Sequence, residues 1–87
     1  MKIYDYEGKK NICGNKIRLA RSSRWMSQSE LAAKMQTEGI TLERDSISRI
    51  EIGARFVADY ELMTFAKVLK VNLEWLLAEQ NDVKTDI

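Results

Sequence analysis

Apolar residues recur every three or four positions in one segment of the chain after another, which is the spacing of a single buried face on an α-helix. The most regular of these segments carries Leu62, Phe65, Ala66 and Leu69. No segment alternates convincingly between apolar and polar residues as a half-buried strand would, and the chain contains no proline that would break a helix. The predicted fold class is therefore all-α, a bundle of short helices.

Local start and stop signals divide the chain into five helices. The first helix is expected at about residues 11–23, and the second from a cap at Ser27 to a break at Gly39. The third is expected at about residues 44–51, with an end at Gly53. The fourth should start from a cap at Asp59 and the fifth from a cap at Asn72. The start of the second helix is the best defined, because Ser27 and Glu30 have the spacing of a capping box. The third helix has a weaker start, because Glu43 stands where a capping serine or threonine is usual.

The 87 residues are enough for one domain with a modest core. Hydrophobic residues make up 45% of the chain, which is more than a disordered segment of high charge would have. We expect an N-terminal extension over residues 1–10, the helical domain over 11–78, and a frayed or disordered polar tail over 79–87.

Several classes of function are disfavoured by residues that the chain lacks. It has no histidine and one cysteine, so the usual metal ligands and general bases are missing and no intramolecular disulfide can form. The cysteine, Cys13, lies on the apolar stripe of the first helix, where we expect it to be a small core residue. We expect no enzyme, no metal site and no cofactor. No apolar run is long enough to span a membrane and no secretory signal is evident, so a cytoplasmic location is expected.

Positive charge is concentrated in one part of the chain, although the net charge is only +1. Residues 8–55 hold ten basic against five acidic residues, and residues 56–87 hold three against six. No acid interrupts the series Lys9, Lys10, Lys16, Arg18, Arg21 and Arg24. This series could face phosphates, and a merely solvated helix surface is the alternative that charge alone leaves open.

Four groups of residues resemble motifs of a known family. They are Ile17, Arg18 and Arg21; Ser27, Gln28, Leu31 and Ala32; Ile47 to Glu51 with Gly53 and Arg55; and Leu62, Phe65, Ala66 and Leu69. Together they resemble the Xre/Cro-like family of lambda-repressor-like helix-turn-helix domains, over about residues 14–77. The resemblance implies a five-helix DNA-binding domain of prokaryotic or phage type. Its second helix positions the domain, and its third, which starts near Arg44, reads the major groove.

The same resemblance implies a set of DNA contacts. Base contacts are expected from Arg44, Asp45 and Arg49, with Ser48 as a lesser candidate, and phosphate contacts from Gln28, Ser27 and Arg55. Lys16, on the basic first helix, is a further candidate for phosphate. Arginine can bond a guanine edge bidentately and aspartate can accept from cytosine, which supports the base contacts independently. Solvated charges at Arg44 and Asp45, and an exposed helix-starting amide at Gln28, remain the alternatives.

A structural role is implied for Arg21 and Glu51, which match a family ion pair between the first and third helices. Leu73, Trp75 and Leu76 on the last helix could form a dimer surface, as the terminal helix does in related repressors. Core packing is the simpler explanation for Leu76 and Leu77, and both explanations stay open for Trp75.

The chain departs from the family pattern at three places. Leu31 and Ile47 are separated by about five residues more than the equivalent positions of the family, with the extra residues around Gln36–Leu42. This predicts a longer positioning helix and a wider turn. Trp25 stands where a small turn residue is usual. Ile52 replaces a polar residue before Gly53 and so brings no side-chain hydrogen bond to phosphate.

The predicted function is a sequence-specific regulator of transcription, with a repressor favoured, that binds double-stranded DNA as a homodimer. The alternative is a protein-interaction module of antitoxin or adaptor type that uses the C-terminal helix for a protein partner.

Overall fold

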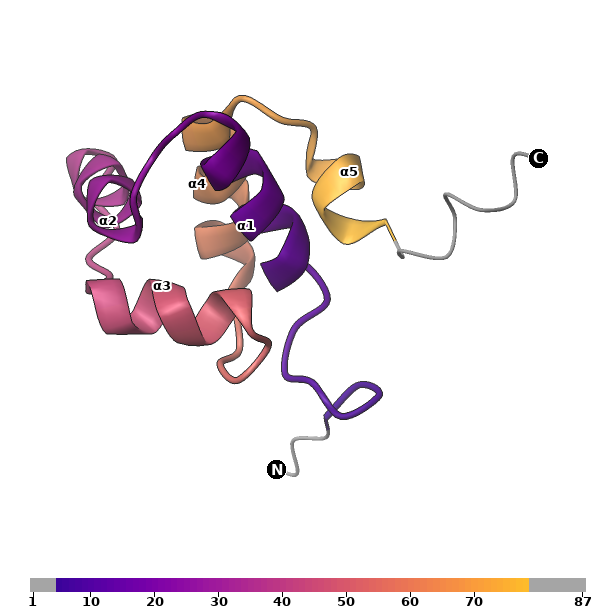
Figure 1. Cartoon of the computed structure of the whole chain (residues 1–87). Helices are drawn as coiled ribbons and strands as arrows, with labels where there is room; N and C mark the ends of the chain where they lie inside the picture. Colours follow the sequence, from indigo (N-terminus) through magenta and orange to yellow (C-terminus); the bar gives the residue numbers. More distant parts are fainter. Residues whose placement is uncertain (1–4, 79–87) are drawn as a thin grey trace.

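The computed structural model describes residues 5–78 of the chain. It contains five helices: α1 Gly14–Ser23, α2 Gln28–Thr37, α3 Arg44–Glu51, α4 Asp59–Leu69 and α5 Leu73–Leu77 (Figure 1). No strand is present in this part of the chain, and the predicted all-α class is confirmed. The polar tail expected over 79–87 lies outside the described residues.

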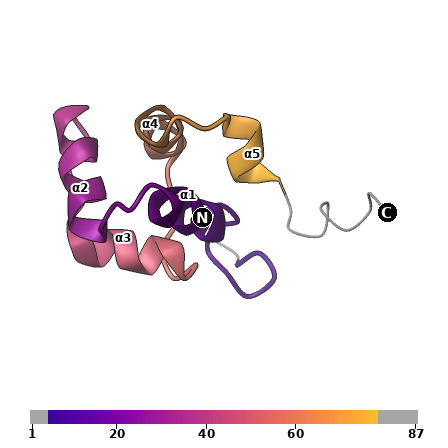
Figure 2. The ribbon, with the colours of Figure 1, turned by 45° about the horizontal axis from the view of Figure 1, so that its top comes forward.

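Helix α1 runs through the middle of the bundle, where it contacts α3, α4 and α5. The second helix packs on α3 and α4, and α5 packs on α1 and α4. In Figures 1 and 2, α2 and α3 lie on one side of α1 and α5 lies on the other. Among the described residues, no helix has the length and apolar character needed to cross a membrane.

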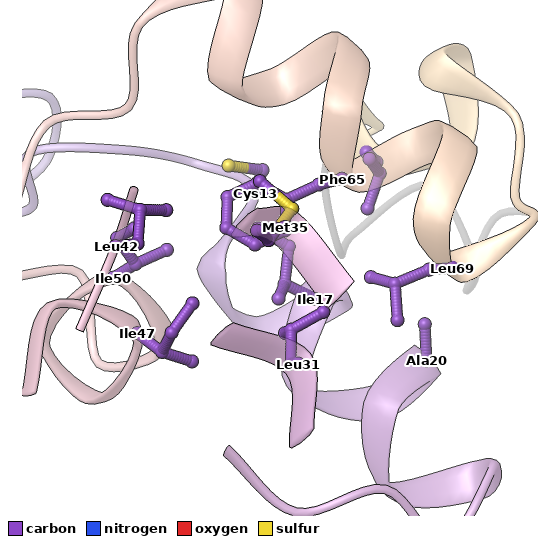
Figure 3. Packing of buried hydrophobic residues seen from close by; sticks show 11 residues of the cluster. Cys13, Ile17, Ala20, Leu31, Met35, Leu42, Ile47, Ile50, Phe65 and Leu69 are labelled. Atoms are coloured by element: carbon purple, nitrogen blue, oxygen red, sulfur yellow. The ribbon is translucent and has the colours of Figure 1, made fainter. Parts of the chain in front are cut away.

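One core holds these helices together, and its side chains converge between α1, α2, α3 and α4 (Figure 3). Its buried apolar residues are Cys13, Ile17, Ala20, Leu31, Met35, Leu42, Ile47, Ile50, Phe65, Leu69 and Leu76. Burial raises the pKa of the Cys13 thiol to about 11, which keeps it protonated and unreactive. This agrees with the expected place of Cys13 in the core.

The N-terminus of α1 lies three residues later than the sequence predicts, because a side chain organises the residues before it. Asn11 accepts from the Gly14 amide through Oδ1 at 2.7 Å. Its Nδ2 donates to the carbonyls of Ile50 at 3.0 Å and Arg55 at 2.8 Å. Asn11 therefore joins the start of α1 to the end of α3 and to the loop that follows.

Helix caps follow the sequence signals in part. The Ser27 capping box is confirmed: the Glu30 amide donates to Ser27 Oγ at 3.0 Å, and the Ser27 amide donates to Glu30 Oε1 at 2.7 Å. The cap expected at Asp59 is wrong by one residue. Ala58 takes the capping position, since Glu61 reaches back to accept from the Ala58 amide at 2.9 Å.

The turn between α2 and α3 occupies residues 38–43. It contains Gly39, which has a φ of +89°, and it is anchored by buried Leu42 and partly buried Ile40. The wide turn expected from the extra residues is therefore present, and two apolar side chains fix it to the core.

Candidate nucleic-acid interface

One face of α3 is polar and exposed. Ile47 and Ile50 are fully buried on the opposite face. The residues that the sequence predicts as base contacts lie at i, i+1, i+4 and i+5 along the helix, which places them on one side. They are Arg44, Asp45 and Arg49, which are exposed, and Ser48, which is half-buried.

The two charges at the start of this face are held only loosely. Arg44 Nη1 lies 3.5 Å from Asp45 Oδ1, and the side chains are 63% and 82% exposed. An ion pair as exposed as this contributes little to stability. Both side chains therefore remain available to an external partner.

A buried ion pair fixes α3 against α1. Arg21 Nε donates to Glu51 Oε2 at 2.6 Å and Nη2 donates to Oε1 at 3.0 Å, with the Glu51 side chain 2% exposed. The hydrogen bond to Glu51 raises the pKa of Arg21. The expected ion pair is thus present, and it is bidentate. The remaining Arg21 donor, Nη1, reaches the Met26 carbonyl at 2.7 Å, so the α1–α2 turn is fixed to the same unit.

Gln28 has a different environment from the one expected. Its Nε2 donates to Glu51 Oε1 at 3.0 Å, so the side chain completes the buried pair and ties α2 to α3. The structure therefore gives Gln28 an internal contact, and its contact with phosphate stays a prediction. Ser27 is exposed, with Oγ accepting from the Glu30 amide, and its contact with phosphate stays a prediction.

Arg55 also has an internal role, which the sequence does not predict. Its guanidinium donates to Glu61 at 3.1 and 3.3 Å and to the Phe56 carbonyl at 2.8 Å. Burial raises the pKa of Glu61, but the hydrogen bonds from Arg55 and from the Ala58 amide outweigh it and hold that pKa below its ordinary value. Arg55 therefore joins the α3–α4 loop to α4, and its contact with phosphate stays a prediction.

Lys16 is turned inward, against the expectation that it contacts phosphate. The residue is 7% exposed, and its ammonium donates to the carbonyls of Trp75 at 3.0 Å and Ala78 at 3.2 Å. The ammonium also lies 4.8 Å from the centre of the Trp75 ring, within range of a cation–π interaction. Lys16 therefore caps the end of α5 and is removed from the candidate interface.

The exposure of the α5 side chains differs at two residues from what the sequence predicts for a dimer surface. Leu76 is fully buried in the core, so it cannot contribute to a surface. Leu77, for which core packing was expected, is 40% exposed, and so is Leu73 one turn earlier. Trp75 is 38% exposed, between the two alternatives that the sequence left open.

Comparison with known proteins is informative for the fold. The structure is similar to the crystal structure of a hypothetical transcription factor, NHTF, from Neisseria, with a TM-score of 0.74 and 22% sequence identity. The match covers 100% of this chain and 94% of that chain. The chain therefore shares the fold of that protein. No protein-family model matches the chain and no curated protein sequence matches it significantly, so membership of the Xre/Cro-like family stays a prediction.

Proposed function

We propose that this chain is a sequence-specific regulator of transcription that binds double-stranded DNA and reads the major groove with α3. The observation that carries the proposal is the exposed face of α3, where two arginines and an aspartate stand together on a helix fixed from behind by a buried pair. A rigid helix with such side chains suits readout of base edges. The repressor role rests on the resemblance to phage-repressor-type domains.

Selection from a pool of random duplexes tests this function directly. We expect a recurring sequence motif, bound more tightly than random DNA, with an affinity that falls as salt rises because phosphates are neutralised. Enrichment of no motif by a correctly folded protein would contradict the proposal. It would leave the rival function, a protein-interaction module that uses exposed Leu73 and Leu77 of α5.

Replacement of Arg44, at the start of α3, tests whether this helix contacts the bases of the selected site. Arg44→Ala is expected to weaken binding to the selected site by about 1–3 kcal/mol and to relax the choice of one base pair, because a planar guanidinium can bond a guanine edge bidentately. The loss on random DNA should be smaller. Equilibrium titration of both duplexes measures the two losses.

The matched control is Lys34→Ala, which removes one exposed positive charge from α2. It should leave the ratio of selected to random affinity as it is in the wild type, since a lysine offers only a point charge to phosphate. A ratio that Arg44→Ala also leaves unchanged would exclude α3 as the reading helix.

We further propose that the regulator binds as a homodimer. One short recognition helix contacts too few base pairs to define a site, and two helices related by symmetry double that number. The selected motif should then contain inverted half-sites about one helical turn apart, ~34 Å. A motif without inverted symmetry, bound at full affinity by a single chain in analytical ultracentrifugation, would contradict the dimer.

A further inference from the structure

Trp25 combines two features that are unfavourable for the isolated protein. Its backbone is in the left-handed region, with a φ of +55°, and 94% of the residue is exposed. Both features are costly for a large side chain, and its exposure shows that it gains almost no packing within the chain. The other tryptophan, Trp75, packs over Lys16 and is 38% exposed.

The left-handed conformation is required by the way α1 ends. The Trp25 amide donates to the Ser22 carbonyl at 3.0 Å, and the Met26 amide donates to the Arg21 carbonyl at 3.2 Å. These two bonds form a Schellman motif, in which the residue at the position of Trp25 is usually glycine. Glycine would adopt this conformation without steric cost, so the indole is the feature that requires an explanation.

The turn that carries Trp25 is held rigidly against α3. Arg21 donates both to the Met26 carbonyl, next to Trp25, and to Glu51 at the end of α3. The capping residue of α2, Ser27, follows two residues after Trp25. The indole is therefore presented from a fixed position beside the start of α2.

The chemistry around Trp25 favours a polyanion. No acidic residue occurs over residues 9–29, and Arg18 and Arg24 are exposed there. The first acid after Trp25 is Glu30, whose carboxylate is engaged by the Ser27 amide. Exposed arginines beside an exposed indole complement the phosphates and sugars of a nucleic-acid backbone.

We propose that Trp25 contacts the DNA backbone beside the groove that α3 enters. The ring packs against a deoxyribose, and the indole N–H, a donor without acceptor capacity, donates to a phosphate oxygen. This inference rests on the proposed DNA-binding function. It assigns to the α1–α2 turn a contact that adds affinity without reading sequence.

Trp25→Gly tests the inference and cannot fail merely by unfolding, because glycine suits the Schellman position. We expect thermal unfolding at or above the wild-type temperature, together with an affinity about three- to tenfold lower on selected and random duplexes alike. The dependence of affinity on salt should not change, because no charge is removed. Trp25→Asn, which also tolerates the left-handed conformation, should show the same loss.

Fluorescence supplies a second readout. The chain contains two tryptophans, so Trp75→Phe leaves Trp25 as the single tryptophan while an aromatic ring stays over Lys16, and excitation at the red edge of the absorption band avoids the tyrosines. Acrylamide should quench Trp25 readily in the free protein and much less in the DNA complex. The affinity of Trp75→Phe for DNA is measured first, so that quenching is compared between the free protein and a complex that is known to form.

The outcomes separate this inference from the proposed function. DNA binding by the wild type, with an unchanged affinity in Trp25→Gly and full quenching in the complex, overturns the contact and leaves the function standing. A wild type that binds no duplex overturns both. A change of oligomeric state in Trp25→Gly without DNA would place a second copy of the chain at Trp25 and would also overturn the inference.

Discussion

Replacing Glu51 with alanine is expected to lower the free energy of unfolding by about 3 kcal/mol, near the lower limit for breaking a buried ion pair. The loss is large because Glu51 accepts from both Arg21 and Gln28 in a place where water has little access. Without the carboxylate, a guanidinium and an amide lose their acceptor together. Urea denaturation followed by circular dichroism measures the change.

An exposed ion pair of the same chain provides the matched control. Lys67 Nζ lies 2.7 Å from Glu38 Oε1, but the lysine side chain is 71% exposed. Glu38→Ala should therefore cost less than about 1 kcal/mol. Equal losses in the two variants would show that the Arg21–Glu51 pair does not fix α1 to α3.

Gly14→Ala is expected to destabilise the fold by about 3 kcal/mol or more, since the new methyl group would overlap a backbone atom that cannot move aside alone. A Cβ on Gly14 would overlap the Ile50 carbonyl oxygen and would lie 2.9 Å from Asn11 Oδ1. Relief of the overlap requires α1 to separate from α3, and the Asn11 hydrogen bonds would be strained with it. Thermal and urea unfolding should both report the loss.

Gly39→Ala distinguishes this contact from the general cost of replacing a glycine. Gly39 has a φ of +89°, and a Cβ there would meet no heavy atom within 4 Å. Its replacement should cost about 1–2 kcal/mol from backbone strain alone. A Gly14→Ala protein that is no less stable than Gly39→Ala would contradict the close approach of α1 to α3.

Features that depend on near neighbours in the chain could be predicted from the sequence. The capping box at Ser27 and Glu30 needs residues three apart, and the break after α2 needs only Gly39. The buried face of α4 follows from regular spacing. The error at the start of α1 has a long-range cause, since the partners of Asn11 lie on Ile50 and Arg55.

The polar side chains of the candidate interface were harder to assign, because a sequence does not show which way a long side chain turns. Lys16, Gln28 and Arg55 all looked like surface residues that could reach phosphate. In the structure each donates to a group brought near by the tertiary fold: the carbonyls at the end of α5, Glu51 and Glu61. Arg44 and Asp45 lie on the side of α3 opposite buried Ile47 and Ile50, and they stay exposed.

The central claim is that α3 reads a DNA sequence, and competition at equilibrium tests it most directly. A labelled duplex that carries the selected motif is titrated with the protein at several salt concentrations, against an unlabelled duplex of the same composition in scrambled order. The proposal predicts that the motif binds at least about a thousandfold more tightly at physiological salt, and that both affinities fall as salt rises. Equal affinities for the two duplexes at every salt concentration would contradict it.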